Sequence, residues 1–513
     1  MFRQTAYAIA LFLSSACGLI IEIVAGRLIA PYVGMSLYTW TAIIAVVLAG
    51  LSAGHWIGGR LAKAHVGNQT GARRIAIALA LAAVSSLASL VLLREVSALL
   101  LVSHLTPIVV IIVLTSALFL LPSLFVGIVS PILTKLAIDA DPDNHGPVIG
   151  RMYALGTLGS IAGTLSAGYL FISWIGSSGT VIAVAVVYAL LALAFAITDT
   201  RRGTLLVFLI AISSTLSWWG QQVEAFTSPC RVESNYFCIR TDDFRPQSGR
   251  TSTLMALDHL VHSINDRDDP GLLYSPYIHG VDELAKRRFL QHGDGFSPRA
   301  FFIGGGGYSL PRAWINDYHI PELLVAEIDP QVTRVAAEDM WLNTQSPGMI
   351  IHHRDARPLL QSLPTDDKFD LVFGDAFHDI SIPAHLVTRE FHREIAARLD
   401  AKGFYAVNVV DSGRQPMFLF SLLKTLKKDF PVTEVWIESE EIGNPGRVTY
   451  IVISSATPSV RGKITSTRGP VRTWVRWPMD DLETRVAQAQ VPVLSDDFAP
   501  VDRLMSHLLM QAE

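Results

Sequence analysis

Three groups of residues in the second half of the chain have the types and spacing that chemistry requires. A run of glycines, Gly304 to Gly307, lets a ligand come close to the backbone. The acids Glu327 and Asp329 follow about 20 residues later, where a carboxylate can accept hydrogen bonds from ribose hydroxyls. Two more acids, Asp355 and Asp375, come shortly after apolar stretches. The pattern predicts a nucleotide site, and the alternative for the glycines is a tight turn without a ligand.

Alternating strands and helices would bring these residues together. Apolar runs predict strands at 300–303, 323–328, 349–353, 369–373, 403–409, 432–438 and 448–454, with helices between them, among others at about 330–341 and 388–399. Ligands of parallel sheets bind at the carboxyl edge of the strands, where these acids would lie. The pattern predicts a doubly wound, Rossmann-like α/β domain. Two strands at 233–240 and 251–262 would form a small β-rich extension before it.

The first part of the chain differs from the rest in composition. Residues 1–219 hold 11 Lys and Arg and 6 Asp and Glu, whereas the remainder holds 30 basic and 39 acidic side chains. Apolar runs near 7–30, 37–57, 74–93, 107–136, 149–173 and 179–197 are long enough to span a bilayer, and a shorter one lies at 203–219. These runs predict a multi-pass α-helical membrane domain with six or seven spans.

The charges between the runs predict an orientation in a cell (inner) membrane. The basic residues of two loops, and Arg3 at the N-terminus, indicate a cytoplasmic location for both loops and the N-terminus; the loop residues are Arg60, Lys63, Arg73, Arg74, Arg201 and Arg202. Seven spans would then place the soluble part outside. The cytoplasmic side is slightly favoured instead because nucleotide cofactors are made there, and the seventh run would then lie in the interface. The sequence leaves both sides open.

The composition of the soluble part also bears on its partners. Its excess of acids argues against nucleic acid and suits a small cationic substrate. No pattern of Cys and His residues suggests a metal site. Cys230 and Cys238 would pair if they face an oxidising compartment, and free thiols are the alternative.

Several motifs identify a family resemblance. The sequence reads ESNY at 233–236, LDHLVH at 257–262, IGGGG at 303–307, EID at 327–329, DA at 355–356 and GDAF at 374–377. With these motifs, the chain resembles the spermidine synthases (polyamine aminopropyltransferases), in a form fused to an N-terminal membrane domain. The resemblance implies a transmembrane domain at 1–220, a β-rich entry at 221–265, a spermidine synthase-like Rossmann domain at 266–460 and a C-terminal extension at 461–513.

The resemblance implies a reaction and a set of site residues. Decarboxylated S-adenosylmethionine would give an aminopropyl group to a polyamine or other small amine, with release of methylthioadenosine, and no metal would be needed. Asp375 matches the family's catalytic acid. The residues that match the nucleotide site are Gly304, Gly305, Gly306, Gly307, Glu327, Asp355 and Ala356. Those expected near the amine are Tyr277, His262, His378 and Asp379. The resemblance also makes a homodimer plausible.

One departure from the family bears on the donor. The fourth position of the glycine loop normally carries an acid that holds the donor's ammonium group, and here it is Gly307. Asp496 and Asp497 are candidates to replace that acid. Without it, ordinary S-adenosylmethionine is an alternative donor, for aminocarboxypropyl transfer, methyl transfer or cleavage. A polyamine transporter or sensor with a non-catalytic nucleotide-binding domain is a further alternative.

Overall fold

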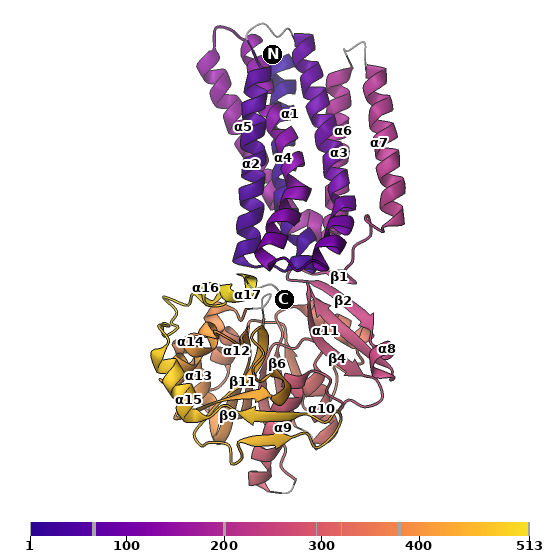
Figure 1. The fold of residues 1–513 in the computed structure, drawn as a ribbon. Helices are drawn as coiled ribbons and strands as arrows, with labels where there is room; N and C mark the ends of the chain where they lie inside the picture. Colours follow the sequence, from indigo (N-terminus) through magenta and orange to yellow (C-terminus); the bar gives the residue numbers. More distant parts are fainter. Residues whose placement is uncertain are drawn as a thin grey trace. The chain divides into compact units, whose positions relative to one another are not determined.

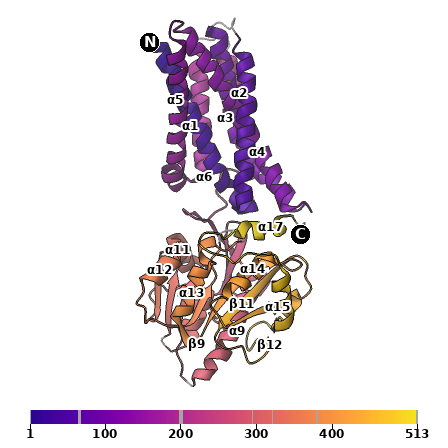
Figure 2. The ribbon, with the colours of Figure 1, turned by 90° about the vertical axis from the view of Figure 1, so that its left-hand side faces the viewer.

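A computed structural model describes residues 2–63, 68–197, 202–293, 295–319, 321–377 and 381–510. The chain forms two compact units, Met1–Cys238 and Ile239–Glu513. The four domains expected from the sequence are a finer division than this one, and their bounds stay predictions. Figures 1 and 2 show the elements of each unit.

The first unit is a bundle of long helices (Figure 1). Among the described residues, five helices are long and apolar enough to cross a membrane, judged by length and composition. The helices are α1 (Phe2–Val33), α2 (Leu37–Leu61), α3 (Asn68–Leu101), α4 (Pro107–Asp139), α5 (His145–Ser166), the π-helical turn η1 (Ala167–Phe171), α6 (Ile172–Ala196) and α7 (Arg202–Gln222).

The fifth of these candidates, His145–Ala196, contains a break. It counts 52 residues, which as one straight helix would be about 78 Å long, against about 30 Å for the hydrocarbon core of a bilayer. At Gly176 the backbone leaves the helix, with φ 70° and ψ 175°. We therefore treat the segments before and after Gly176 as two passes. With the 21-residue helix α7, the described chain runs along the bundle seven times.

Close packing in the bundle depends on glycines. A Cβ atom at Gly54 on α2 would lie 2.2 Å from the carbonyl oxygen of Leu124 on α4, and one at Gly58 would lie 2.5 Å from that of Ile128. Conversely, a Cβ at Gly127 on α4 would lie 2.7 Å from the carbonyl oxygen of Leu51. Small residues spaced along one helix face thus bring two backbones together, as their spacing in the sequence predicts.

The segment that follows α7 is held at one end of the bundle. Arg94 on α3 donates to the carbonyl oxygens of Glu224 (3.3 Å) and Thr227 (2.9 Å). Arg27 on α1 donates to the carbonyl oxygen of Tyr236 at 2.8 Å and to that of Ser234. Both arginines lie towards the C-terminal ends of helices that start at the other end of the bundle, so the chain leaves the bundle at the end opposite its N-terminus.

Two further contacts fix the same segment, which contains the short strand β1 (Val232–Glu233). The Glu233 carboxylate accepts hydrogen bonds from the backbone N–H (2.9 Å) and hydroxyl (2.6 Å) of Ser177, the first residue after the break in α6. Cys230 and Cys238 form a disulfide bond, the first of the two alternatives that the sequence left open.

The second unit begins with a small antiparallel sheet. Its strands are β2 (Cys238–Asp243), β3 (Ser252–Leu257) and β4 (Leu260–Asp266), with the short helix α8 (Arg245–Ser248) after β2. The single strand expected at 251–262 is wrong. The chain turns tightly at Asp258 and His259, with a left-handed φ of 53° at Asp258, and the two halves pair as a hairpin.

The main sheet has nine strands in the order β12-β13-β10-β11-β9-β8-β5-β6-β7. Strands β7, β6, β5, β8 and β9 are parallel, and the remaining pairings are antiparallel. The strands are β5 (Arg299–Ile303), β6 (Glu322–Ala326), β7 (Met349–His352), β8 (Phe369–Gly374), β9 (Leu399–Ser412), β10 (Val432–Glu438), β11 (Arg447–Ser455), β12 (Lys463–Thr465) and β13 (Thr473–Arg476). All seven strands predicted for this sheet are present, within a few residues of the expected bounds.

Helices cover both faces of this sheet. Tyr450 and Val452 on β11 belong to a buried core with Leu423 of α14, whereas Ile451 contacts α9 at Gly280. The helices are α9 (Pro276–Phe289), η2 (Leu290–His292), α10 (Ser309–Asp317), α11 (Pro330–Asp339), α12 (Ala356–Ser362), η3 (Ala384–Leu386), α13 (Arg389–Arg398), α14 (Met417–Leu426), η4 (Ser439–Glu441), α15 (Met479–Gln488), α16 (Val501–Leu504) and α17 (Ser506–Met510). The predicted Rossmann-like α/β arrangement is present in this unit.

The order of the parallel strands reverses at β5. From β5 the chain adds β6 and β7 on one side, and then β8 and β9 on the other. The carboxyl ends of β5 and β8 are therefore neighbours at the switch point, where α/β sheets of this kind bind ligands. The glycine loop follows β5, and Asp375 follows β8.

The glycine contacts between α2 and α4 lead to a test of bundle stability. We expect Gly54→Ala to lower the thermal unfolding temperature of the full-length protein in detergent, because the added methyl group collides with a backbone oxygen, at a cost of about 1–3 kcal/mol. Gly59→Ala is the matched control, since a Cβ there meets nothing within 4 Å. An unchanged unfolding temperature in Gly54→Ala would contradict the close helix approach.

Candidate active site

The glycine loop packs directly against the end of β8. Gly304 has φ 98°, a backbone conformation that favours glycine, and a Cβ there would lie 2.6 Å from the carbonyl oxygen of Asp375. The Asp375 N–H donates to the carbonyl oxygen of Ile303 at 2.9 Å. The loop and Asp375 are therefore fixed relative to each other by their backbones.

Glu327, just after β6, holds the glycine loop from the other side. One carboxylate oxygen accepts the N–H groups of Gly305 (2.8 Å) and Gly306 (3.2 Å), and the other accepts that of Asp329 (2.9 Å). Burial raises the pKa of this carboxyl, and these hydrogen bonds act in the opposite direction. A carboxylate offers about four acceptor positions, so one remains for a ribose hydroxyl.

Asp329 has a structural contact of its own. Its carboxylate accepts the N–H of Gln331 at 2.9 Å and caps helix α11. Of the two acids that the sequence offered for ribose, Glu327 is therefore the one that also contacts the glycine loop.

Asp375 is held by side chains from two distant parts of the chain. The Tyr277 hydroxyl, in the first turn of α9, donates to one carboxylate oxygen at 3.1 Å. The Asn408 amide, on β9, donates to the other at 2.8 Å. The residue is half-buried, but its carboxyl is surrounded by protein. This desolvation raises the pKa of Asp375 to about 7, while the hydrogen bonds from Asn408 and Tyr277 lower it.

Asn408 is a site residue that sequence reasoning missed. It is buried within the apolar strand β9, and its side-chain oxygen has no hydrogen-bond partner among the described residues. The available signal was a single amide in an otherwise apolar run. Such an amide also suits an ordinary strand position, so its role was visible only once β9 was placed beside β8.

Asp355 is the N-cap of α12 and Ala356 is the first residue of this helix, so both follow β7 at the same edge of the sheet. The Asp355 carboxylate caps α12 by accepting the N–H of Arg357 at 2.9 Å, and it lies 2.7 Å from Nε2 of His385. The hydrogen bond with His385 is the main cause that lowers the pKa of Asp355. The structure thus adds His385, from η3, to the residues at the expected adenine end of the site.

Asp496 is engaged elsewhere and does not replace the missing loop acid. Arg357 binds both of its carboxylate oxygens, each at 2.7 Å. This ion pair belongs to the region around Asp355, so the suggestion that Asp496 holds a donor ammonium group is wrong. The neighbouring Asp497 is exposed.

Gly307 has no room for a side chain. A Cβ there would lie 2.5 Å from Cβ of Ser263 and 2.9 Å from Cε of Met340. The Gly307 N–H also donates to the Ser263 hydroxyl at 2.8 Å. An acid in this loop position would require β4 to move, so Ser263 explains the departure from the family pattern in physical terms.

A small cavity of about 90 Å³ adjoins Tyr277. Two carboxylates, Glu438 and Glu441, and one cation, Arg447, lie in its wall. The other lining residues are Pro276, Trp436, Thr449, Ile451 and Trp474. Burial raises the pKa of Glu438, although Arg472 lies 3.5 Å from it. Sequence reasoning did not select either glutamate, because the two lie in a surface-like acidic run, 438–441, that begins at the last residue of β10.

Of the remaining candidates near the amine, the structure describes His262 but not His378 or Asp379. His262, on β4, is half-buried, and burial and the charge of Arg447 lower its pKa to about 4, so its imidazole is neutral near pH 7. His378 and Asp379 lie outside the described residues. Within the described ranges, no group of three or more His, Cys, Asp or Glu residues could hold a metal ion.

Comparison with known proteins supports the family resemblance. No family model matches the sequence. The polyamine aminopropyltransferase of Vibrio vulnificus is 30% identical over 146 residues, which cover 28% of this chain and 46% of that protein. A probable polyamine aminopropyl transferase of Bifidobacterium longum is 24% identical over 229 residues, covering 41% of this chain and 50% of that protein. The chain thus spans about half the length of the curated relatives it matches.

Among solved structures, a probable spermidine synthase from Corynebacterium glutamicum is 19% identical, with a TM-score of 0.45. The match covers 54% of this chain and 99% of that chain. The sequence relatives confirm the resemblance to polyamine aminopropyltransferases for part of the chain, and the residue roles remain predictions.

Proposed function

We propose that this chain, a relative of the polyamine aminopropyltransferases, is a membrane-anchored transferase that moves an aminopropyl group from decarboxylated S-adenosylmethionine to a small amine. The observation that carries the proposal is the Asp375 carboxyl. Its pKa of about 7 suits a general base, and it lies beside the glycine loop at the switch point of the sheet.

The nucleotide part of the donor would lie along the carboxyl edge of β5, β6 and β7. Glu327 would accept a ribose hydroxyl at its remaining acceptor position while it holds Gly305 and Gly306. Asp355 and Ala356 would meet the adenine. Because the backbones of Gly304 and Asp375 are in close contact, the reacting carbon would lie beside these two residues.

The chemical step would be a displacement at carbon. The amine nitrogen forms a bond to the propyl carbon next to the sulfonium, and the carbon–sulfur bond breaks. Its electron pair stays on sulfur, which gives neutral methylthioadenosine. Before the attack, Asp375 would accept a proton from the ammonium group of the substrate, which frees the lone pair of the nitrogen, and Tyr277 and Asn408 keep that carboxylate aligned.

The acceptor would extend from Asp375 into the small cavity at Tyr277. Carboxylates and aromatic faces both attract ammonium groups, and this cavity offers Glu438, Glu441, Trp436 and Trp474. A diamine with one nitrogen at Asp375 could place its other end there.

A second donor is favoured by one observation. Because Ser263 and Met340 occupy the space next to Gly307, no acid can stand there to bind the donor's ammonium group or to repel a carboxylate. Ordinary S-adenosylmethionine, which carries that carboxylate, is therefore the second candidate donor.

We place the soluble unit on the outer, oxidising side of the membrane, rather than on the slightly favoured cytoplasmic side. The chain leaves the bundle at the end opposite its N-terminus. At the N-terminal end, four basic residues lie at or near the junction of α2 and α3: Arg60, Lys63, Arg73 and Arg74. The disulfide bond between Cys230 and Cys238 lies at the exit end, and disulfides persist in oxidising compartments. The donor would then have to be supplied from outside the cytoplasm.

The reaction is tested by release of methylthioadenosine from the purified full-length protein. Each donor is supplied with and without putrescine or spermidine. We expect release only with the decarboxylated donor and an amine, and at least about a 100-fold loss of turnover in Asp375→Asn, because the substitution removes the base.

The same assay separates the alternatives. Nucleotide binding, measured by calorimetry, should be retained in Asp375→Asn, which serves as the folding control. Release of methylthioadenosine from ordinary S-adenosylmethionine would mean that this compound, and not its decarboxylated form, is the donor. Nucleotide binding without any release by the unaltered protein would contradict the transferase and leave a transporter or sensor.

The pKa of Asp375 leads to a pH dependence. The carboxylate must be deprotonated to accept a proton, so turnover at saturating amine should rise with pH and level off above a midpoint near 7. Asn408→Leu removes a hydrogen bond that lowers this pKa, so the midpoint should move to higher pH. Asp411→Asn is the control: burial raises the pKa of Asp411 to about 7 as well, but its carboxylate accepts N–H groups of Ser412 and Leu419. If the midpoint of the pH profile shifts in Asp411→Asn and not in Asn408→Leu, Asp375 is not the group that titrates.

The membrane side is tested with reporters at the C-terminus. We expect an alkaline phosphatase fusion to be active in bacterial cells and a green fluorescent protein fusion to be dark, because the first requires export and the second does not fold after it. The Cys230–Cys238 bond should also resist labelling by maleimide until a reductant is added. The opposite reporter pattern would put the soluble unit in the cytoplasm.

A further inference from the structure

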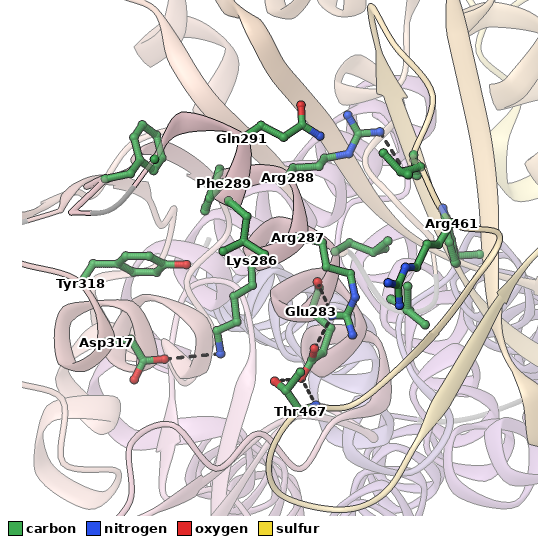
Figure 3. Close-up of a pocket in the computed structure, with 18 of the residues that line it drawn as sticks. Glu283, Lys286, Arg287, Arg288, Phe289, Gln291, Asp317, Tyr318, Arg461 and Thr467 are labelled. Carbon is green, nitrogen blue, oxygen red and sulfur yellow. Dashed lines mark hydrogen bonds and ion pairs between the residues drawn. The ribbon is translucent and has the colours of Figure 1, made fainter.

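A second cavity, of about 960 Å³, lies at the other end of helix α9 (Figure 3). Its wall includes the segments that precede β5 and β6, so it lies at the amino edge of the parallel strands, whereas Asp375 lies at their carboxyl edge. None of the residues assigned above to the nucleotide or to proton transfer lines it. The volume falls in the range of about 300–1,000 Å³ typical of small-molecule sites.

The cavity has an apolar body built largely from rings. Phe289 and Phe296 lie with ring centroids 5.3 Å apart, and Phe289 and Tyr318 with centroids 6.1 Å apart. Trp436 and Ile464 add apolar surface from the strands. Such a lining favours a ligand with a flat, apolar body.

Among the described residues that line the cavity, cations outnumber acids. Lys286, Arg287, Arg288 and Arg461 line the cavity, against Glu283 and Asp317. Both acids are already engaged, as Figure 3 shows. Glu283 binds Arg287 and accepts the N–H (2.6 Å) and hydroxyl (2.7 Å) of Thr467. Asp317 lies 3.5 Å from Lys286 (Figure 3). It also lies 2.7 Å from Arg468, which is outside the lining. Lys286 also lies 2.6 Å from Asp282, so within the described ranges Arg288 and Arg461 are the cations of the lining that no acid of the lining pairs with.

Two of the arginines have unused donors. Arg288 is only 8% exposed and donates to the Ser459 hydroxyl at 3.1 Å, yet its Nε–H has no partner among the described residues. Glu434 lies 3.7 Å from Arg288 but is shared with Arg476. Arg461 is exposed on the segment that follows β11, and no hydrogen bond or ion pair of its side chain is seen within the described ranges.

We propose that this cavity binds a small organic anion with a flat apolar body, whose carboxylate or sulfonate group is held by Arg288 and Arg461. The cations of the lining disfavour a polyamine, which is itself a cation, so we treat this as a second site, although Trp436 lies in the walls of both cavities. The same helix connects the two: Tyr277 is in the first turn of α9, and Lys286 to Phe289 form its last turn. A bound anion would thus hold the helix that carries Tyr277.

The test is binding of 4-fluorobenzenesulfonate to the full-length protein in lipid nanodiscs, followed by broadening of its fluorine NMR signal. We expect broadening with the unaltered protein and at least tenfold weaker binding by Arg461→Glu. Arg245→Glu is the matched control, since it makes the same charge change at an exposed arginine on α8. The fluorine signal of 4-fluorobenzylamine, a cation of similar size, should not broaden.

Three outcomes would overturn the proposal. One is equal binding by the unaltered protein and Arg461→Glu, and another is equal binding of the sulfonate and the amine. The third is a dimeric particle that Arg461→Glu dissociates, because the cavity would then be an interface with a second copy. Methylthioadenosine release should be unaffected by Arg461→Glu, so a failure here is distinct from a failure of the proposed transferase activity.

Discussion

The candidate site depends on keeping one carboxyl, that of Asp375, away from water without leaving it unpaired. A buried carboxylate is unfavourable unless hydrogen-bond donors replace its hydration. Tyr277 and Asn408 supply these donors from α9 and β9, on opposite sides of Asp375 in the sequence. The backbone contact with Gly304 fixes the height of the carboxyl above the sheet. The strand order, the glycine loop and helix α9 thus all help to surround the Asp375 carboxyl with protein in place of water.

The sequence predicts the elements of this site better than its contacts. The run from Phe301 to Asp329 shows a strand, a glycine loop, a helix and a second strand because each follows a local rule of periodicity or turn chemistry. Asn408 and Ser263 follow no local rule, since their roles arise only where strands distant in sequence meet. The hairpin at Asp258 was missed for a related reason: its turn, Asp258 and His259, contains no glycine or proline, and apolar residues stand on both sides of it.

In the membrane part, too, features set by neighbouring residues can be predicted from the sequence, whereas contacts between residues far apart in the sequence cannot. Hydropathy locates the helices, and the spacing of Gly50, Gly54 and Gly58 indicates their close packing. In the sequence, Arg27 is a charge within the first apolar run and Arg94 directly follows the third. In the structure, each is paired with carbonyl oxygens more than a hundred residues away. Charges of this kind serve to hold the chain where it leaves the bundle, which hydropathy alone does not reveal.

A base with a pKa near 7 has a particular meaning for a domain outside the cytoplasm. Cells buffer their interior, but the space beyond the inner membrane follows the acidity of the surroundings. A transferase placed there would lose the charge of Asp375 whenever the environment turned mildly acidic, and would regain it as the medium became neutral. The desolvation of one carboxyl would thereby make product formation respond to external acidity without any separate sensor.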